Sequence, residues 1–215
     1  MLKIWGRRNS INVQKVMWAV GELGLAHEHI PAGGAFGGLD TGEFGVLNPH
    51  RRVPVIDDDG TVVWESHAIV RYLAAKYGSE TLWPEEPAAR SFADRWTDWA
   101  LGELQPTFHT GVFWNFYRTP EEQQNWPTIR KAIARSAILF RLLDRHLESH
   151  AFLAGDNFTF GDIPAGALLF RYFELKIDRP SLPQVEGWYE RLKARPAYRE
   201  HVMVPFDDLK GRLAF

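Results

Sequence analysis

The sequence contains no cysteine, and this absence excludes a whole class of chemistry. Without a thiol, the chain cannot form a disulfide, hold a metal through thiolates or carry out Cys-X-X-Cys redox reactions. If the protein performs thiol chemistry, the sulfur atom has to come from a bound ligand.

The sequence also lacks a long apolar run and a strong net charge. No uninterrupted apolar segment approaches the roughly 20 residues that span a membrane. Arg7 and Arg8 interrupt the N-terminus too early for a signal peptide. The formal net charge of -2 is no reason to expect nucleic acid or an anionic membrane as a partner. We therefore expect a cytoplasmic protein.

What is present is an ordinary globular composition, with 45% apolar and 24% charged residues. A length of 215 residues is natural for two compact domains rather than one small core. The nine tryptophans are many for this length, and we expect them in core packing or in a dimer contact.

The first part of the chain alternates between strand and helix patterns. Short apolar stretches at residues 2–5 and 27–31 predict strands. Between them, a helix is expected to begin after Ser10, and four apolar residues recur in it at helical spacing: Val13, Val16, Met17 and Val20. Four glycines within residues 33–38 predict a flexible loop without regular structure, and this loop lacks the Lys-Ser/Thr ending of a phosphate-binding motif.

A β-hairpin and a second helix are expected next. The apolar runs at residues 53–56 and 61–64 flank Asp57-Asp58-Asp59-Gly60, and Asp-Gly is a strong turn signal. We interpret the three aspartates as a solvated turn rather than as a metal site. A helix from Glu65 to Gly78 completes the order β-α-β followed by β-β-α, which is typical of a thioredoxin-like domain.

After the prolines at positions 84 and 87, only helical patterns follow. They cover residues 88–117, 129–147, 165–173, 184–195 and 196–203. Pro106 suggests a bend in the first of these helices. Thr159 to Asp162 has the form of a capping box, with Asp in the place of Glu. The expected fold class is therefore an α/β domain over residues 1–80 and an all-α domain over residues 88–215.

Three segments of the first domain have a distinctive order and spacing: Ser10 to Val16, Asn48 to Pro54 and Glu65 to Leu73. Taken singly, each has a structural explanation, as a helix cap, a strand-start proline and an acidic helix start. Together they resemble glutathione S-transferases of the cytosolic, bacterial-like type, which carry Asn-Pro-x-Gly-x-Val-Pro followed by Glu-Ser-x-Ala-Ile-x-x-Tyr-Leu. The resemblance covers essentially the whole chain, and the residues around Ser10 look closest to the serine-type theta, delta and phi classes.

This resemblance implies a binding role for four residues of the first domain. Val53 would precede a cis Pro54, and its backbone would pair with the cysteinyl backbone of glutathione as an added strand does. Glu65 and Ser66 would lie at a helix start, where a hydroxyl and free N–H groups suit the γ-glutamyl carboxylate. Glutathione would be a co-substrate, and no metal is expected.

The same resemblance places Ser10 at the reacting sulfur. A hydroxyl that donates a hydrogen bond to sulfur stabilises the thiolate, and the positive end of a helix adds to this effect. Asn12 and Asn9 are rival donors. The neighbourhood of the first strand, Trp5-Gly6-Arg7, has no tyrosine for a tyrosine-type mechanism, and the cysteine-type mechanism is excluded because cysteine is absent.

The chain departs from the family pattern at two places that concern the glycyl carboxylate of glutathione. Arg51 stands where the family has glycine. Leu39 and Asp40 stand where phi-like members have basic residues. The cation that binds this carboxylate is therefore open among Arg52, Arg51 and His50.

The electrophile pocket of such an enzyme would lie between the domains. An aromatic-rich stretch after the linker is either its lining or core packing: Phe108, His109, Phe113, Trp114, Phe116 and Tyr117. His109 is expected to be structural, because no base is needed once the thiolate exists. The resemblance also implies a homodimer. Two alternatives stay open, namely a glutathione-dependent reductase, peroxidase or isomerase on the same site, and a non-catalytic module that binds glutathione or a protein.

Overall fold

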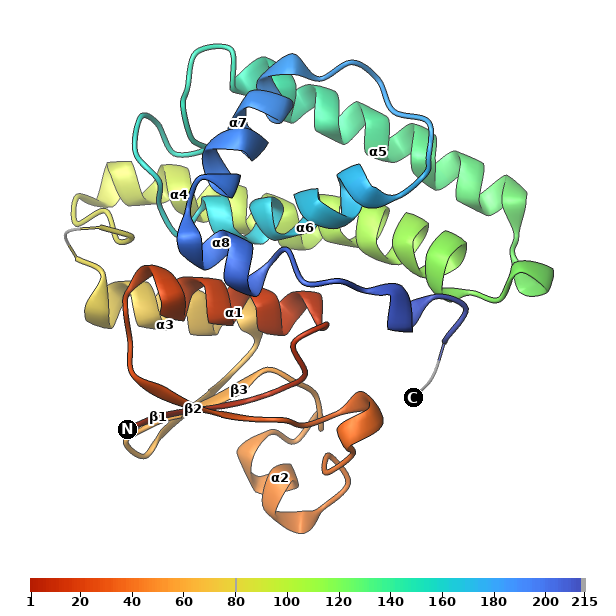
Figure 1. Ribbon diagram of the computed structural model, residues 1–215. Coiled ribbons are helices and arrows are strands. Elements are labelled where there is room, and N and C mark those ends of the chain that lie inside the picture. Colours follow the sequence, from red (N-terminus) through yellow and green to blue (C-terminus); the bar gives the residue numbers. More distant parts are fainter. Residues whose placement is uncertain (80, 214–215) are drawn as a thin grey trace.

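The computed structural model describes residues 1–79 and 81–213, and its first part is built on a four-stranded mixed sheet (Figure 1). The strands are β1 (Leu2–Trp5), β2 (His27–Ile30), β3 (Val55–Asp58) and β4 (Thr61–Trp64), in the order β2-β1-β3-β4. β1 is parallel to β2 and antiparallel to β3, and β3 is antiparallel to β4. With helices α1 (Ile11–Glu22) and α3 (Ser66–Tyr77), this confirms the predicted order β-α-β and β-β-α.

Helices α1 and α3 lie side by side between the sheet and the helices of the second part (Figure 1). The sheet-facing side of α1 carries the apolar residues that the sequence pattern identified, and they share a core with Ile4 and Ile56 of the sheet. The opposite side of α1 packs on α8 (Pro196–His201) and α6 (Asp162–Glu174). On that side, Trp18 meets Tyr198 edge to face at 4.8 Å, and Arg195 pairs with Glu22 at 2.6 Å.

The first strand of the predicted hairpin lies two residues further along the chain, and the second strand has the predicted bounds. Strand β3 begins at Val55 rather than at residue 53, so Asp57 and Asp58 belong to the strand and the turn is Asp59-Gly60. The interpretation of all three aspartates as a solvated turn is therefore wrong for Asp58, which is buried. Its carboxylate accepts hydrogen bonds from the side chains of Tyr72, Lys76 and Tyr77.

The expectation that residues 33–38 lack regular structure is wrong for Gly34–Phe36, and a further short helix, which no sequence pattern predicted, follows this segment. Gly34–Phe36 forms one 3-10 turn (η1), and Gly42–Leu47 forms helix α2. The hydroxyl oxygen of Thr41 caps α2 by accepting a hydrogen bond from the backbone N–H of Phe44 at 3.2 Å. Both helices are too short to show an apolar period, so a pattern search misses them.

The second part of the chain is helical, as predicted. It contains α4 (Pro87–Trp99), η2 (Ala100–Arg118), η3 (Glu121–Gln123), α5 (Trp126–His146), α6, α7 (Pro183–Lys193), α8 and η4 (Asp207–Leu209). Helices α4 and η2 are continuous, and from Ala100 the backbone adopts the wider π-type pattern. Pro106, where the sequence suggests a bend, lies inside η2 and removes one backbone donor there.

The capping box at the start of α6 is confirmed. The carboxylate of Asp162 accepts a hydrogen bond from the backbone N–H of Thr159 at 3.0 Å, and the hydroxyl of Thr159 accepts one from the N–H of Gly161 at 3.2 Å. A second carboxylate oxygen accepts from the N–H of Leu153 at 2.9 Å, which ties the preceding loop to the helix.

Within the described ranges, no helix combines the length and apolar character needed to cross a membrane. Two of the sequence-based domain limits, at residues 80 and 215, fall outside the described residues.

Candidate functional site

A cavity of about 620 Å³ joins the first loop, the segment before β3, and the helices of the second part. Six of the ten predicted site residues line it: Ser10, Asn12, Arg52, Val53, Phe113 and Trp114. The remaining four, His50, Pro54, Glu65 and Ser66, are not among its lining residues. The structure therefore brings the expected sulfur-binding and strand-pairing residues together with the aromatic stretch of η2.

Ser10 occupies the N-cap position of α1, but its hydroxyl does not cap the helix. The structure shows no capping hydrogen bond from this side chain, although the Ser10 carbonyl accepts the first helical bond, from the N–H of Gln14 at 2.9 Å. The backbone N–H of Ser10 in turn donates to the carbonyl of Arg7 at 3.0 Å. The hydroxyl is thus held at the cavity and at the positive end of a helix without being used by that helix.

Asn12 reaches the cavity from the first turn of α1, and a buried lysine holds its side-chain oxygen. The ammonium group of Lys15 donates to Asn12 Oδ1 at 3.1 Å, to Gln105 Oε1 of η2, and to His67 Nε2 at 2.9 Å. Lys15 has no exposed surface. Burial lowers the pKa of Lys15 to about 7, against the opposing effect of Glu65. Three acceptors match the three N–H bonds of an ammonium group.

The rival amide, Asn9, has its donor engaged elsewhere. Its Nδ2 donates to the Oδ2 of Asp208 at 2.5 Å, and its backbone carbonyl accepts from Arg171 Nη2 at 2.6 Å. Asn9 lines the cavity beside Ser10, but its amide N–H group is directed to a carboxylate.

The start of α3 presents free backbone donors. Glu65 precedes the helix with a φ of 69°, a left-handed conformation that costs a non-glycine residue about 1 kcal/mol or more. Ser66, the first residue of the helix, is 6% exposed. The N–H groups of the first turn have no intrahelical partner, so this end attracts an anion.

The expected cis peptide bond between Val53 and Pro54 is present. Val53 lines the cavity, whereas Pro54 is buried beneath it. Asn48, at the other end of this segment, donates from Nδ2 to the carbonyl of Arg52 at 2.8 Å and accepts from the N–H of His50 at 2.9 Å. The Asn-Pro segment thereby fixes the backbone that leads to Val53.

The three candidate cations for the glycyl carboxylate differ in their surroundings. Arg51 has a φ of 52°, which explains the glycine of the family pattern, and its Nη1 donates to the carbonyls of Leu39 at 2.9 Å and Thr41 at 2.8 Å. His50 contacts the ring of Trp64 at 5.3 Å and does not line the cavity. Arg51 and Arg52 are both exposed and both line the cavity, and the side chain of Arg51 is tied to the two carbonyls.

The aromatic stretch of η2 divides between core and lining. Phe108 has no exposed surface and packs on Phe140 and Tyr172, so it belongs to the core. Phe113 and Trp114 line the cavity. Phe113 also has no exposed surface and belongs to the same core, whereas Trp114 is partly exposed.

His109 is a buried residue that lines the cavity. Its ring stacks on Phe113 with centroids 5.3 Å apart, and its Nε2 accepts a hydrogen bond from Arg171 Nη1 at 2.8 Å. Burial, followed by the charges of Arg171 and Lys15, lowers the pKa of His109 well below its ordinary value.

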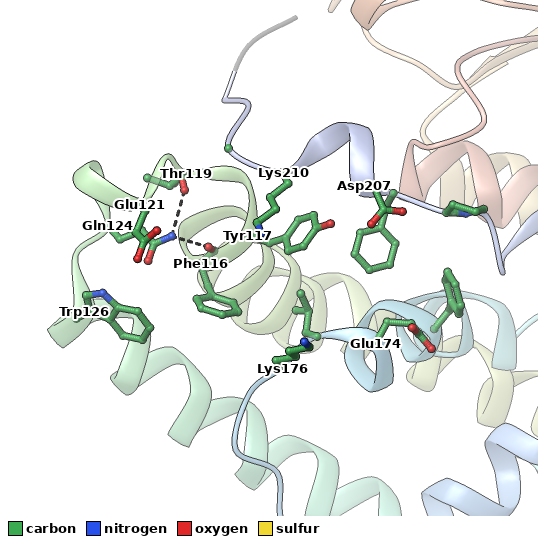
Figure 2. A pocket seen from close by; sticks show the side chains of 15 residues that line it. Phe116, Tyr117, Thr119, Glu121, Gln124, Trp126, Glu174, Lys176, Asp207 and Lys210 are labelled. Atoms are coloured by element: carbon green, nitrogen blue, oxygen red, sulfur yellow. Dashed lines mark hydrogen bonds between the residues drawn. The ribbon is translucent and has the colours of Figure 1, made fainter.

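Phe116 and Tyr117 line a second cavity, of about 640 Å³, shown in Figure 2. Gln124 lies at its edge and donates from Nε2 to the carbonyls of Phe116 at 2.8 Å and Thr119 at 3.2 Å. Phe113 of the first cavity packs on Tyr117 and on Phe206 of the second. The rings of Phe113, Tyr117 and Phe206 therefore lie between the two cavities.

Sequence reasoning missed four charged residues at or beneath the first cavity: Arg7, Lys15, Arg118 and Arg171. Lys15 had a usable signal, since it is the one charged residue between Ile11 and Gly21 in a helix that packs on both sides. The arginines had none, because they meet only after the chain folds. In the described part of the chain, no group of three or more His, Asp or Glu side chains is placed to hold a metal ion.

Two family models match the chain. "Glutathione S-transferase, N-terminal domain" matches residues 1–75, and "Glutathione S-transferase, C-terminal domain" matches residues 107–196. Glutathione S-transferase GstB of Escherichia coli strain K12 is 39% identical over 207 residues, which cover 95% of this chain and 99% of that protein. Glutathione S-transferase 3 of Zea mays is 31% identical over 212 residues, which cover 94% and 93%.

Solved structures give the same result. The theta class glutathione S-transferase from Xanthomonas axonopodis pv. citri, with glutathione bound, has a TM-score of 0.91 and 44% identity, and the match covers 95% of this chain and 98% of that chain. A delta-class glutathione transferase from Nilaparvata lugens has a TM-score of 0.83 and 26% identity, with 94% and 92% covered.

Proposed function

The chain belongs to the glutathione S-transferase family, and we propose that Ser10 is the residue that activates the thiol of bound glutathione. The enzyme transfers glutathione, its co-substrate, to an electrophile. The observation that supports the role of Ser10 is its hydroxyl, which lies at the cavity and at the first turn of α1 without capping that helix.

The physical effect of this hydroxyl is a shift of the thiol pKa. A free thiol has a pKa of about 8.5, so little of it is thiolate at neutral pH. A hydrogen bond to a charged acceptor contributes about 1.5–3 kcal/mol, which lowers the pKa by about one to two units. The thiolate then becomes a major species, and the transfer needs only an electrophile held nearby.

We place glutathione along the segment before β3 and across the start of α3. The backbone of Val53 would pair with the cysteinyl unit, and Ser66 with the free N–H groups of α3 would bind the γ-glutamyl carboxylate. Glu65 would orient the γ-glutamyl amine. Arg52 is the cation that we propose for the glycyl carboxylate, because it is exposed at the cavity whereas the Nη1 of Arg51 is bound to two carbonyls.

Asn12 is the rival donor to the sulfur. Because Lys15 holds its side-chain oxygen, the NH₂ group of Asn12 is the part left for the cavity. We assign Asn12 a supporting contact and Ser10 the main one, because a hydroxyl at the helix N-terminus also benefits from the helix dipole.

The test is the ultraviolet absorbance of the thiolate of bound glutathione, titrated with pH in four proteins. We expect Ser10→Ala to raise the thiol pKa by about one unit or more, with a smaller rise for Asn12→Ala. Ser181→Ala removes an exposed hydroxyl outside the cavity and should match the wild type. An unchanged pKa in Ser10→Ala together with a raised one in Asn12→Ala would assign the role to Asn12.

Calorimetry with glutathione separates an enzyme or a glutathione-binding module from an empty scaffold, since a scaffold that does not bind the tripeptide gives no saturable heat. The hydrophobic part of the electrophile would rest on Phe113 and Trp114, which line the cavity.

We further propose domain limits of 1–80 and 88–215, a homodimer, and a cytoplasmic location. The limits are supported by the end of α3 at Tyr77 and the start of α4 at Pro87. The dimer is supported by the exposed apolar side chains of Phe92 and Leu101 on the α4–η2 stretch. Sedimentation equilibrium should give twice the chain mass for the wild type and less for Leu101→Glu, and a monomeric wild type would contradict the dimer.

A further inference from the structure

Three arginines from distant parts of the chain line the first cavity together: Arg7, Arg118 and Arg171. Arg7 lies in the loop after β1, Arg118 is the last residue of η2, and Arg171 lies in α6. Arg118 and Arg171 are each only 2% exposed, and Arg7 is half-buried. Guanidinium groups are rarely this buried unless anions or other strong acceptors accompany them, and here a single carboxylate, that of Asp208, acts on all three.

Arg171 is held by neutral partners. Its Nη1 donates to His109 Nε2 at 2.8 Å, and its Nη2 donates to the carbonyl of Asn9 at 2.6 Å. The Nε of Arg171 is buried and has no hydrogen-bond partner among the described residues. Its guanidinium also lies 4.5 Å from the ring centroid of Phe113, which leaves the positive charge in place.

The other two arginines add charge at the same place. Arg118 donates from Nε to the carbonyl of Arg212 at 2.8 Å and lies 4.0 Å from the ring centroid of Trp114. Burial and then the charges of Arg7 and Arg118 lower the pKa of Arg171 to about 9. The three positive charges are therefore close enough to repel one another. The negative charge of Asp208 raises the pKa of all three arginines and so opposes these effects.

We propose that this cavity selects electrophiles that carry a carboxylate on an aromatic frame, with Arg7, Arg118 and Arg171 binding the carboxylate and Phe113 and Trp114 contacting the ring. The proposal rests on the proposed function, because glutathione must supply the thiolate. Guanidinium forks bind carboxylates through paired, charge-assisted hydrogen bonds, and the unpartnered Nε of Arg171 offers one such donor.

The arginines are placed for the electrophile rather than for glutathione. Arg118 and Arg171 belong to the helical part, whereas the residues proposed for the two glutathione carboxylates, Arg52 and Ser66, belong to the first part. Ser10 lines the same cavity as Arg52 and the three arginines, so the sulfur would be between the tripeptide and the arginines.

The test uses a matched pair of aryl chlorides, 4-chloro-3,5-dinitrobenzoate and its neutral carboxamide. In both, the thiolate sulfur attacks the carbon that bears chlorine; the C–S bond forms, the C–Cl bond breaks, and chloride leaves with the electron pair. The carboxylate or amide is unchanged. Each enzymatic kcat/KM is divided by the rate constant of free glutathione with the same compound, which removes the difference in intrinsic reactivity.

We expect the wild type to prefer the benzoate by about tenfold or more, since charge-assisted hydrogen bonds contribute on this scale. Arg7→Gln should remove most of this preference through the KM of the benzoate. Arg8→Gln removes the same charge from the exposed neighbouring residue, which does not line this cavity. This variant should keep the preference for the benzoate. Arg171→Lys retains a charge without the fork and should give an intermediate value.

Two results would overturn the proposal. One is a wild type that uses the amide as well as the benzoate. The other is an Arg7→Gln variant that raises the KM of glutathione and leaves the preference unchanged, which would assign the arginines to the tripeptide. Calorimetry with glutathione shows which proposal has failed. If glutathione binds but the enzyme does not prefer the benzoate, only the anion site is overturned. If glutathione does not bind, the proposed function is overturned as well.

Discussion

The ammonium nitrogen of Lys15 lies 2.9 Å from the Nε2 of His67, in a buried contact between α1 and α3. While Lys15 is protonated its ammonium group only donates, so Nε2 accepts and His67 carries its proton on Nδ1. Burial, followed by the charges of Lys15 and Arg71, keeps the pKa of His67 far below its ordinary value, so the ring is neutral. This contact connects the helix that carries Ser10 to the helix that begins at Ser66.

Replacing Lys15 with methionine should destabilise the protein. The change removes the Lys15 donor from three acceptors, Asn12 Oδ1, Gln105 Oε1 and His67 Nε2. Of these, His67 Nε2 is buried and loses its donor, whereas Asn12 Oδ1 keeps a hydrogen bond from Gln105 Nε2 at 3.4 Å. We expect the free energy of unfolding to fall by about 2–4 kcal/mol, measured by urea denaturation. Lys131→Met, on the exposed face of α5, is the control and should change it by about 0.5 kcal/mol or less. Equal effects of the two substitutions would contradict the role of the buried contact.

Lys15 should also give the stability of the protein a specific pH dependence. Its pKa is about 7 in the folded state and 10.5 ordinarily, so between these values the unfolded chain binds more protons than the folded chain. The free energy of unfolding therefore rises with pH over this window, and the group contributes no slope below it. Urea denaturation between pH 7 and 9 should show stability rising in the wild type relative to Lys15→Met. A constant difference between the two proteins would show that Lys15 does not titrate in this window.

Two substitutions of Arg51 separate the effect of its hydrogen bonds on stability from the effect of its left-handed backbone conformation. Arg51→Gly and Arg51→Ala both lose the hydrogen bonds to Leu39 and Thr41, but only alanine must adopt the left-handed φ of 52°. We expect Arg51→Ala to be less stable than Arg51→Gly by about 1 kcal/mol, measured by thermal or urea unfolding. If alanine were the more stable of the two, the backbone at this position would differ from the one described.

Asp58 should stabilise the hairpin and α3 only while it is ionised. Burial raises its pKa, but hydrogen bonds from Lys76, Tyr72 and Tyr77 outweigh burial and leave the pKa below its ordinary 3.8. The contribution is therefore present above pH 3.8 and lost as the pH falls through the lower, folded-state pKa.

The variant Asp58→Asn tests this point. We expect it to lower the free energy of unfolding by about 1–3 kcal/mol near neutral pH, with a difference from the wild type that shrinks below pH 4. Asp59→Asn, an exposed neighbour in the turn, should cost less. A difference that persists unchanged at low pH would mean that the carboxylate charge is not what stabilises this contact.

Local patterns predicted most of the fold. The spacing of Val13, Val16 and Val20 identified α1, and the Asp-Gly turn identified the hairpin to within two residues. Helix α2 escaped prediction because six residues cannot show a period. The burial of Asp58 was not predicted, because a run of aspartates is typical of a solvated turn. Its burial depends on contacts with Tyr72 and Tyr77, which lie in α3.

The sequence by itself determined the order of the strands and of the longer helices and the absence of an internal thiol, since each depends on residue types and short spacings. The cis proline at Pro54 was implied by the family resemblance of the Asn48 to Pro54 segment. Only the tertiary structure decided that the hydroxyl of Ser10 does not cap α1, that Arg51 is bound to two carbonyls at the cavity it shares with Arg52, and that Arg7, Arg118 and Arg171 meet. The physical reason is that burial and charge proximity belong to contacts between distant segments, and those contacts exist only once α1 is packed between the sheet and the helical domain.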